Sequence, residues 1–545
     1  MPRWIAKRFK GLGLVWLWAI PGIGVAYFFY TLTWLPNAPL LDGDEAVYAL
    51  MADFFSPFSD KSAAVVQLVM RHSVFPPLYP LLLGLLGAAS SHIGLAHVIT
   101  TTFLLTALGF YFLWVRRELE SIRVAAALTL AVAVLPVTIY QSLPIASENL
   151  YLVITLAVLY LAGRSTDDDR WRYLIAVVAG LAAATRTVGI ALIAAYAVHL
   201  YVVRSSRRNL LTALVLMLAP LSTWIVWTKL QGYYGSYVVA FLSALHGPSF
   251  SDMLTDQLAT GIKAVWSGWV TSFDGSPSAM TITVSAATLA LCIAGLARRL
   301  YDRKLDALYV ALYLLIIVAW PYPAEARRLL YGVLPIMLFQ GADLLIFLLR
   351  LAPATAVRPL APVAYVLVLL IVSSPALGLI ADRFRQGQTP PYRAYAYSAN
   401  WYTEPDLQRA VRRAAEQVRI ARAWRELPTF VPAGQCIYHI KPAPLALHAG
   451  RMSYLTPYVA NGDSHRFLEQ ANQCRYFYLG AFSYYPYNEP FYPEKYLQGK
   501  MRVVTIDRLD DVAGEPILGV LVERVDEPRA APASRADRQQ FELRR

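Results

Sequence analysis

The chain has 545 residues, of which 57% are hydrophobic and only 16% are charged. This composition excludes an ordinary soluble protein, in which about a quarter of the residues carry a charge. It predicts a protein that crosses a membrane many times, since each span needs roughly 20 apolar residues. The net charge of +13 does not indicate nucleic-acid binding, because most Lys and Arg residues lie in short loops between apolar runs, where they set orientation.

The first apolar run extends to Pro36 and follows four basic residues, Arg3, Lys7, Arg8 and Lys10. It is too long for a signal-peptide core and has no clear cleavage site, so we expect a retained anchor with a cytoplasmic N-terminus. About eleven spans are predicted, with two fewer or two more as alternatives because two segments are short. The predicted spans lie near 12–35, 95–115, 123–141, 149–163, 173–185, 188–203, 210–229, 279–297, 305–320, 329–349 and 359–380.

The run after Phe75 is only about 14 residues long, which is short for a crossing, so a juxtamembrane or re-entrant helix is expected there. With an odd number of spans, three portions lie outside the cytoplasm. These are a first outer loop at 37–94, a second outer loop at 230–278 and everything beyond about 381. The resulting division is a transmembrane domain at 1–380, an extracytoplasmic domain at 381–527 and a disordered tail at 528–545.

The C-terminal portion predicts a small α/β domain, because its charge is high and its apolar runs are short. We expect a helix at 405–426, strands near 435–441, 475–482, 500–507 and 516–524, and a helix between the first two strands. Cys436 and Cys474 open two of these strands, whereas Cys292 lies within a span. A disulfide in an oxidising compartment and two buried free thiols are equally compatible with this spacing.

Ionisable residues gather at the predicted outer ends of the spans, where they are costly unless they face a protein cavity. They are Asp42, Asp44, Glu45, Glu148, Arg186, Arg327 and Arg328. Most of them have a simpler explanation: a solvated loop for Asp44 and Glu45, a helix N-cap for Glu148, and headgroup anchoring for Arg327 and Arg328. Arg186 is the hardest to explain in this way, because about a dozen residues on either side of it are largely apolar.

Arginines at the membrane surface suit the phosphate of a lipid, because the guanidinium is planar and permanently charged. A carboxylate opposite can deprotonate an acceptor hydroxyl or amine, or hold a divalent cation, while the phosphate departs from a sugar. No Walker loop, dinucleotide-binding glycine motif or zinc-protease motif is present, and no cytoplasmic loop is long enough for a nucleotide-sugar domain. These observations favour a lipid-linked donor.

Several short motifs, in this order, resemble the GT-C membrane glycosyltransferases, and most closely the branch of protein O-mannosyltransferases and lipid A aminoarabinose transferases. They are Asp44-Glu45-x-x-Tyr48, Phe75-Pro76-Pro77-Leu78-Tyr79, Ser147-Glu148, Ala184-Thr-Arg-Thr-Val-Gly189 and Arg328-Leu-Leu-Tyr-Gly-Val-Leu-Pro335. The sequence departs from the family pattern at Phe75, where His or Lys is common, and at Leu329 and Gly332. These departures leave the sugar and the acceptor open.

The resemblance implies a polytopic α-helical enzyme that moves a sugar from a polyprenyl-phosphate donor to a lipid, glycan or protein acceptor on the extracytoplasmic face. It implies that Asp44 or Glu45 is catalytic and that Arg186, Arg327 and Arg328 face the donor phosphate. The implied substrate pocket consists of Asp42, Tyr48, Pro76, Pro77, Tyr79 and Glu148. A divalent cation, Mg²⁺ or Mn²⁺ held by Asp44 and Glu45, is an alternative that the family leaves open.

A transporter or flippase for a lipid-linked glycan is the alternative function. Transporters place ionisable groups near the middle of the bilayer and show internal repeats. Here the charged residues gather at one predicted face and no repeat is evident, so the enzyme is preferred.

Overall fold

The structure is a computed structural model of the chain. It describes residues 20–35, 38–41, 43–59, 75–163, 169–230, 250–320, 322–351, 361–390, 392–397, 399–457, 464–480, 500–508 and 517–525. Internal contacts divide the chain into two compact units. The helical unit comprises Met1–Ala38, Tyr48–Lys61 and Met70–Ala414, and the C-terminal unit comprises Pro39–Val47, Ser62–Val69 and Ala415–Arg545.

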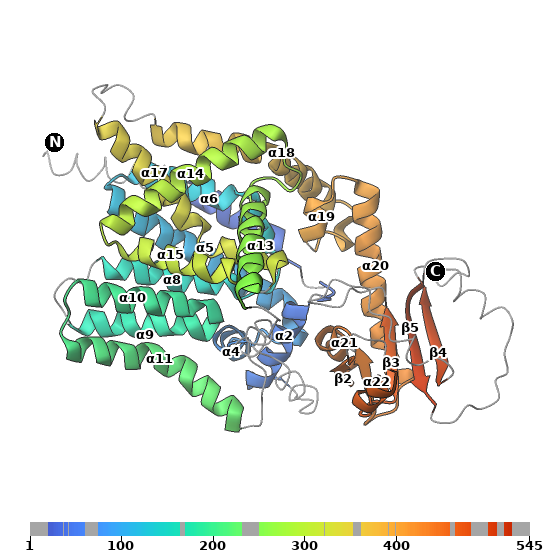
Figure 1. The fold of residues 1–545 in the computed structure, drawn as a ribbon. Helices are drawn as coiled ribbons and strands as arrows, with labels where there is room; N and C mark the ends of the chain where they lie inside the picture. The colour runs from blue at the N-terminus through green and yellow to red at the C-terminus, as the bar shows by residue number, and fades with distance from the viewer. Residues whose placement is uncertain are drawn as a thin grey trace, which may run out of the picture. The chain divides into compact units, whose positions relative to one another are not determined.

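The first unit consists of helices (Figure 1). A helix at Ile20–Thr33 is followed by α2 (Gly43–Phe55), α4 (Leu78–Leu85), η1 (Ser90–His92), α5 (Ile93–Leu119), α6 (Ile122–Val134), α7 (Pro136–Ser142), α8 (Glu148–Ala162), α9 (Asp169–Thr185), η2 (Thr187–Gly189), α10 (Ile190–Val202), α11 (Arg207–Leu230), α13 (Phe250–Thr271), α14 (Ala279–Tyr301), α15 (Leu305–Val318), η3 (Pro323–Glu325), α16 (Ala326–Tyr331), α17 (Leu334–Leu351), α18 (Ala361–Gly387), η4 (Tyr392–Ala394) and α19 (Ala399–Thr403).

Five of the described helices are long and apolar enough to cross a membrane: α5 with η1, α11, α14, α17 and α18. The pair α6 and α7, bent by 61° at Leu135, makes a sixth if it forms one span. The protein is therefore a multi-pass membrane protein. Each predicted span overlaps described helices, but the span at 123–141 is divided between α6 and α7 and the span at 329–349 between α16 and α17. The expected number of eleven crossings is not confirmed, because four further apolar helices are only 10–17 residues long.

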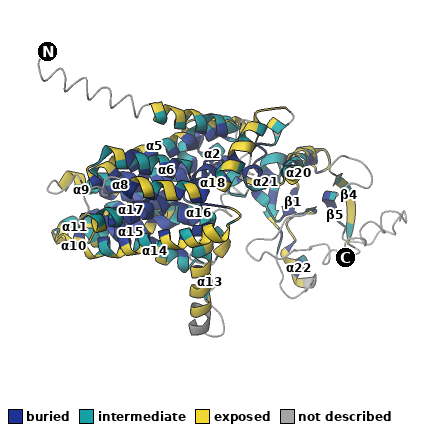
Figure 2. Ribbon diagram, turned by 90° about the horizontal axis from the view of Figure 1, so that it is seen from above, coloured by how far each residue is buried: buried dark blue, intermediate teal, exposed yellow. Residues whose placement is uncertain are grey.

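The helices of this unit differ in how far their side chains are buried. In α8, eleven side chains are buried, from Glu148 to Leu159, whereas only 11% of the apolar stretch of α11 is covered by protein. Figure 2 shows buried residues concentrated on α8 and α17 and exposed residues on α13 and α14. The apolar surface left on α11 suits lipid, in which an exposed hydrophobic helix face is stable.

The second predicted outer loop, 230–278, is not wholly a loop. Its described part contains α13, a helix of 22 residues that packs on α14, α15 and α16. Two glycines seven positions apart, Gly261 and Gly268, allow this close approach. A Cβ at Gly268 would lie 2.9 Å from the backbone nitrogen of Arg327. The sequence did not reveal the helix because its polar and apolar residues alternate around the helix and form no continuous apolar run.

A buried ion cluster joins four helices of this unit. Arg299 of α14 donates from Nε and Nη2 to Asp306 of α15, at 2.8 Å each. It also pairs with Glu118 of α5 and Asp343 of α17, each at 3.0 Å. Because Arg299 is only 5% exposed and is matched by three carboxylates, we interpret this cluster as structural.

The C-terminal unit contains most of α20 (Leu407–Glu426), η5 (Leu427–Thr429), β1 (Cys436–His439), α21 (Pro442–Ala449), β2 (Met452–Leu455), α22 (Ser464–Gln470), β3 (Tyr476–Gly480), β4 (Met501–Arg508) and β5 (Ile517–Arg524). The sheet order is β2-β1-β3-β5-β4, with β1 parallel to β2 and β3, and β5 antiparallel to β3 and β4. The small α/β domain is confirmed. One helix was expected between β1 and β3, and the structure has two, α21 and α22, with the unpredicted four-residue strand β2 between them.

The expected domain boundary at 381 falls inside α18, which continues to Gly387. The compact C-terminal unit begins at Ala415 and also includes Pro39–Val47 from the first outer loop. The predicted tail at 528–545 lies outside the described residues.

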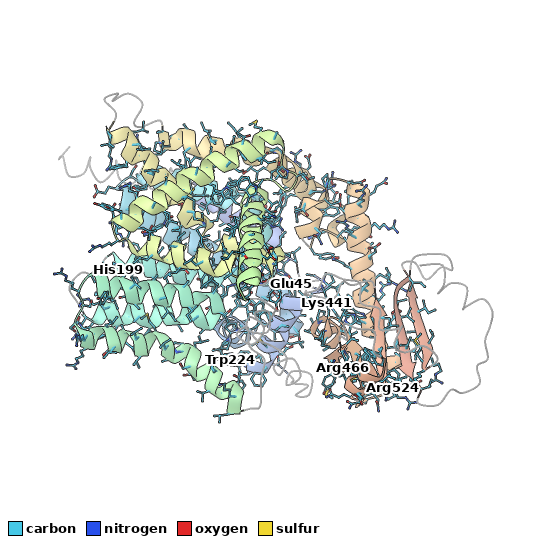
Figure 3. All side chains as sticks on the ribbon, viewed as in Figure 1. Glu45, His199, Trp224, Lys441, Arg466 and Arg524 are labelled. Carbon is cyan, nitrogen blue, oxygen red and sulfur yellow. A yellow bond between two sulfur atoms is a disulfide. The ribbon has the colours of Figure 1, made fainter. Side chains whose placement is uncertain are left out.

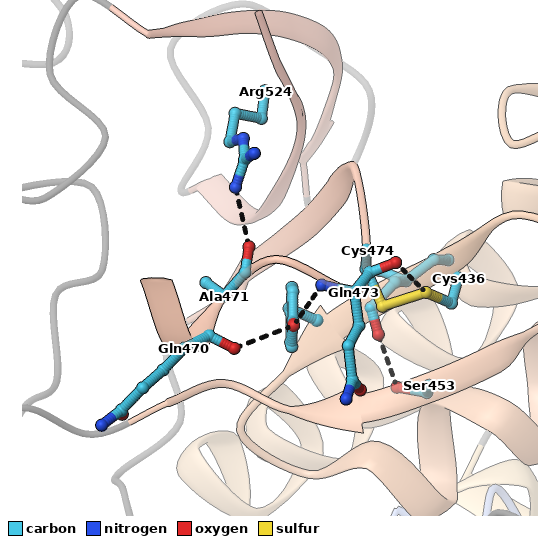
Figure 4. The surroundings of a disulfide bond; sticks show 9 residues. Cys436, Ser453, Gln470, Ala471, Gln473, Cys474 and Arg524 are labelled. Atoms are coloured by element: carbon cyan, nitrogen blue, oxygen red, sulfur yellow. Dashed lines mark hydrogen bonds between the residues drawn. A yellow bond between two sulfur atoms is a disulfide. The ribbon is translucent and has the colours of Figure 1, made fainter. Parts of the chain in front are cut away.

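Cys436 and Cys474 form a disulfide between the start of β1 and the residues before β3 (Figure 4). This resolves the two alternatives that the sequence left open. Cys292 is a buried free thiol in α14.

Candidate functional site

The centre of the site is the start of α8. Ser147 precedes the helix and Glu148 is its first residue. A carboxylate in the first turn is favourable because it faces the positive end of the helix dipole. The position of Glu148 in the first turn of α8 therefore agrees in part with a role at the helix start. Its side chain is nevertheless only 3% exposed and is bound by residues from two distant segments.

Those residues are Arg186 and Arg328. Nη1 of Arg186 lies 2.5 Å from Oε1 of Glu148, and Nε of Arg328 donates to the same oxygen. Arg186 lies between α9 and η2, and Arg328 lies in α16. Their side chains are 14% and 26% exposed. Two of the three predicted phosphate-binding arginines are thus held side by side by one carboxylate.

Two guanidinium groups share a single carboxylate in this group. A buried positive charge is costly unless a further anion or several hydrogen-bond acceptors compensate it. Oε2 of Glu148 is buried and has no hydrogen-bond partner within the described part of the chain. Glu148 therefore holds the two arginines together, and two adjacent guanidinium groups suit an anionic group of a substrate.

Two predicted pocket residues adjoin this group. The hydroxyl of Tyr48 in α2 lies 2.8 Å from Oγ of Ser147, which also accepts a 3.3 Å hydrogen bond from Arg186. The ring of Tyr48 packs edge-on against Phe75 and Tyr79, with centroids 5.2 and 4.9 Å away. The Phe75-Pro-Pro-Leu-Tyr79 motif therefore positions aromatic side chains beside the start of α8.

The two prolines of this motif have a backbone role. Pro77 occupies the N-cap position of α4, and Pro76 precedes it. Proline is well tolerated at a helix start because its missing N–H is not needed there. Tyr79 is fully buried, and its hydroxyl lies 2.6 Å from Oγ1 of Thr100 in α5.

Tyrosines that the sequence did not single out fix the position of α16. The hydroxyl of Tyr331 donates to Oδ1 of Asn149 at 2.9 Å, and that of Tyr313 donates to the carbonyl of Leu329 at 2.9 Å. Both rings are fully buried. The available sequence signal was the position of Tyr331, three residues after Arg328 and therefore on a neighbouring part of the same helix surface.

Arg327 is placed differently from the other two arginines. Its guanidinium carbon lies 5.8 Å from the ring centroid of Tyr140 in α7, in a cation–π contact. The structure thus separates Arg327 from the pair on Glu148. Anchoring at lipid headgroups alone does not account for Arg327 or Arg328, because each contacts a side chain of another helix.

Asp44 and Glu45 lie in the first turn of α2. Glu45 is labelled in Figure 3. Residues 43–47 of this helix belong to the C-terminal unit, and the helix continues into the helical unit from Tyr48 onward. Asp44 and Tyr48 are four residues apart and therefore lie on one face of α2. The remaining predicted acid, Asp42, lies outside the described residues.

Asp44 and Glu45 would supply hard oxygen ligands of the kind that Mg²⁺ and Mn²⁺ prefer. No group of three or more His, Cys, Asp or Glu side chains that could hold a metal ion is found among the described residues. Two adjacent carboxylates are a partial ligand set, so we derive no catalytic step through a metal.

The fold of the chain is similar to that of solved membrane proteins. ArnT from Cupriavidus metallidurans bound to undecaprenyl phosphate aligns over 96% of this chain and 99% of its own, with 14% identity and a TM-score of 0.50. The chain has a GT-C fold. The apo state of ArnT aligns over 94% and 98%, with 15% identity and the same TM-score. An oligosaccharyltransferase from Archaeoglobus fulgidus aligns over 84% of this chain and 67% of its own, with 13% identity and a TM-score of 0.42.

No protein-family model matches the sequence, and no curated protein matches it by sequence comparison. The resemblance to GT-C membrane glycosyltransferases that the motifs indicated is confirmed at the level of the fold.

Proposed function

We propose that the protein is an integral-membrane glycosyltransferase. It takes a sugar from a polyprenyl-phosphate donor and transfers it to a lipid, glycan or protein acceptor on the extracytoplasmic face. The observation that carries the proposal is the joint binding of Arg186 and Arg328 to the buried carboxylate of Glu148. The likeness in fold to ArnT, whose crystal structure holds undecaprenyl phosphate, supports a donor of this class.

The arginine pair suits the donor phosphate. In the donor, the phosphate bridges the sugar and the polyprenyl chain and carries one negative charge. When the bond between the anomeric carbon and the phosphate oxygen breaks, the electron pair stays on the oxygen and the leaving phosphate gains charge. Fixed guanidinium groups stabilise that developing charge more than they stabilise the intact donor, which is what lowers a reaction barrier.

The acceptor needs a base. As the acceptor oxygen or nitrogen bonds to the anomeric carbon, its proton must leave, and a carboxylate can take it. Asp44 or Glu45, in the first turn of α2, is proposed for this role. Tyr48 on the same helix is proposed to line the substrate pocket, together with Tyr79, Pro76 and Pro77.

The proposed orientation places the N-terminus in the cytoplasm and the C-terminal domain outside. The Cys436–Cys474 disulfide supports this side assignment, because structural disulfides persist in oxidising compartments. The basic end of α14, with Arg298 and Arg299, and the loop that follows it, with Arg303, would then lie on the cytoplasmic side, as positively charged segments do.

The test is transfer of a radiolabelled sugar from polyprenyl phosphate by the purified protein in liposomes. Asp44→Asn, Glu45→Gln and Arg186→Ala are compared with Asp382→Asn and Arg385→Ala, which alter an exposed ion pair of α18. We expect at least one acidic variant and Arg186→Ala to lose transfer by about 100-fold or more, with both controls active. Full transfer in all three site variants would reject the assigned residues. Adding EDTA, then Mg²⁺ or Mn²⁺, tests the metal alternative.

A further inference from the structure

A short segment before α2 forms part of the core of the C-terminal domain. Leu41 is only 6% exposed and belongs to the same buried cluster as Trp424 of α20 and Leu445 of α21. This cluster also includes residues of β1, β3 and β5. Residues that precede the proposed catalytic helix in the sequence therefore belong to the core of a unit that consists mainly of Ala415–Arg545.

A hydrogen bond fixes the same segment. Nε2 of His448, in α21, lies 2.5 Å from the carbonyl oxygen of Pro39. Because a carbonyl can only accept, this ring nitrogen carries the proton. Burial lowers the pKa of His448 to about 4, and the nearby Arg425 also disfavours its charged form. At neutral pH the ring is thus a neutral donor with one fixed tautomer.

The residue between these two contacts has an unusual backbone. Leu40 has φ 44°, in the left-handed region that non-glycine residues rarely adopt, and its side chain is 1% exposed. Such a conformation costs roughly 1 kcal/mol or more and persists where the surroundings determine it. Pro39, Leu40 and Leu41 therefore form a segment whose backbone is held in place by its contacts.

The constraint lies directly before the proposed catalytic residues. α2 begins at Gly43, and its first turn contains Asp44 and Glu45. We infer that the C-terminal domain positions these carboxylates for catalysis, with His448 and Leu41 as positioning residues that act through the start of α2. This inference rests on the proposed function. It assigns to the α/β domain a role in the reaction itself.

The inference has a kinetic consequence. A base displaced by about 1 Å can cost up to 100-fold in rate. The arginine pair on Glu148 belongs to the other compact unit. Loosening the Pro39–Leu41 segment should therefore lower kcat and leave the KM for the donor nearly unchanged.

The experiment compares two variants of His448 in the full-length protein. His448→Phe keeps a ring next to Trp424, whose centroid lies 6.1 Å away, but removes the donor. His448→Gln keeps an amide donor close to the position of Nε2. We measure hydrogen exchange of the peptide covering residues 38–47 and, in parallel, kcat and KM for sugar transfer. We expect faster exchange and a kcat about tenfold lower in His448→Phe, with substantial rescue in His448→Gln.

A second pair of variants separates positioning from stability. Leu41→Ala and Val522→Ala each open a cavity in the C-terminal domain, but Val522 lies in a different core cluster. Both should destabilise the domain, whereas only Leu41→Ala should lower kcat per folded molecule. Equal kcat values for His448→Phe and the wild type, or equal losses in Leu41→Ala and Val522→Ala, would overturn the inference. A wild-type protein without transfer would instead refute the proposed function, and the exchange data would still show whether His448 anchors the segment.

Discussion

The carboxylate of Glu148 and the guanidinium of Arg186 lie 2.5 Å apart, and their side chains are 3% and 14% exposed. An ion pair this well buried is sensitive to the loss of either partner, because the remaining charge stays buried without compensation. Arg328 binds the same carboxylate, so loss of Glu148 removes an ion pair from both arginines.

Replacing Glu148 with Gln should therefore cost both stability and activity. The amide keeps the volume but removes the carboxylate charge that both guanidinium groups share, which we expect to destabilise the protein by about 3 kcal/mol. Sugar transfer should fall at least tenfold even in the folded fraction, because the two arginines repel each other. Thermal unfolding in detergent and the transfer assay measure the two effects. The control is Glu120→Gln, at the exposed end of α5; matching behaviour of the two variants would show that Glu148 does not organise the site.

The contact between α13 and α16 gives an independent prediction. A Cβ at position 268 would lie 2.9 and 3.0 Å from the backbone N and Cα of Arg327, which is too close for the helices to stay in place. Gly268→Ala should shift α16, destabilise the protein by about 1–3 kcal/mol and reduce transfer. Gly275→Ala is the matched control, because nothing lies within 4 Å of a Cβ there. Wild-type activity in Gly268→Ala would mean that the position of α16 is not critical.

Much of this architecture could be predicted from the sequence. Long apolar runs placed helices within the expected spans, and short apolar runs placed four of the five described strands, because both signals are local in the sequence. The signals failed where periodicity was weak. β2 is a four-residue strand with one buried side chain, whereas all four side chains of β1 are buried. α13 is amphipathic within a region that was expected to be a polar loop.

The site was harder to predict than the fold. The sequence identified Glu148, Arg186 and Arg328 as unusual because each is ionisable within or beside an apolar run. It could not show that the arginines share one carboxylate, or that Arg327 turns instead to Tyr140, because such pairings depend on tertiary packing. The bond between Pro39 and His448, which are 409 residues apart, had no sequence signal at all.

The disulfide predicts a simple redox response. It closes a loop between residues separated by 38 positions, and a loop of this size stabilises a domain by about 4 kcal/mol in the chain-entropy account. Cys436→Ser with Cys474→Ser, or treatment with dithiothreitol, should therefore lower the thermal stability of the C-terminal domain. Thiol labelling of the denatured protein should find one reactive cysteine, Cys292, without reductant and three with it. Three reactive thiols in the unreduced protein would contradict the disulfide.

Acid should destabilise the same domain. Burial lowers the pKa of His439, in β1, from 6.5 to about 4. The unfolded chain therefore takes up a proton between pH 6.5 and 4 that the folded domain does not, so stability is complete above pH 6.5 and falls as the pH drops toward 4. The full shift corresponds to about 3 kcal/mol.

Native-state hydrogen exchange of β1, corrected for intrinsic rates, measures this dependence. His439→Asn should flatten it, because the side-chain oxygen of Asn can accept the hydrogen bond that the Lys441 backbone N–H donates to Nδ1 and does not titrate. The same slope in His439→Asn and the wild type would assign the acid sensitivity to other groups, of which His448 is the first to test.

The most direct test of the proposed donor site is the affinity for polyprenyl phosphate itself, measured with the full-length protein in nanodiscs. Arg186→Ala and Arg328→Ala should each weaken binding roughly thirtyfold, which corresponds to about 2 kcal/mol for a charge-assisted hydrogen bond. Arg385→Ala, with a side chain that is 77% exposed, should bind like the wild type. Wild-type affinity in both site variants would contradict the account, because the arginine pair would then have no role in holding the donor phosphate.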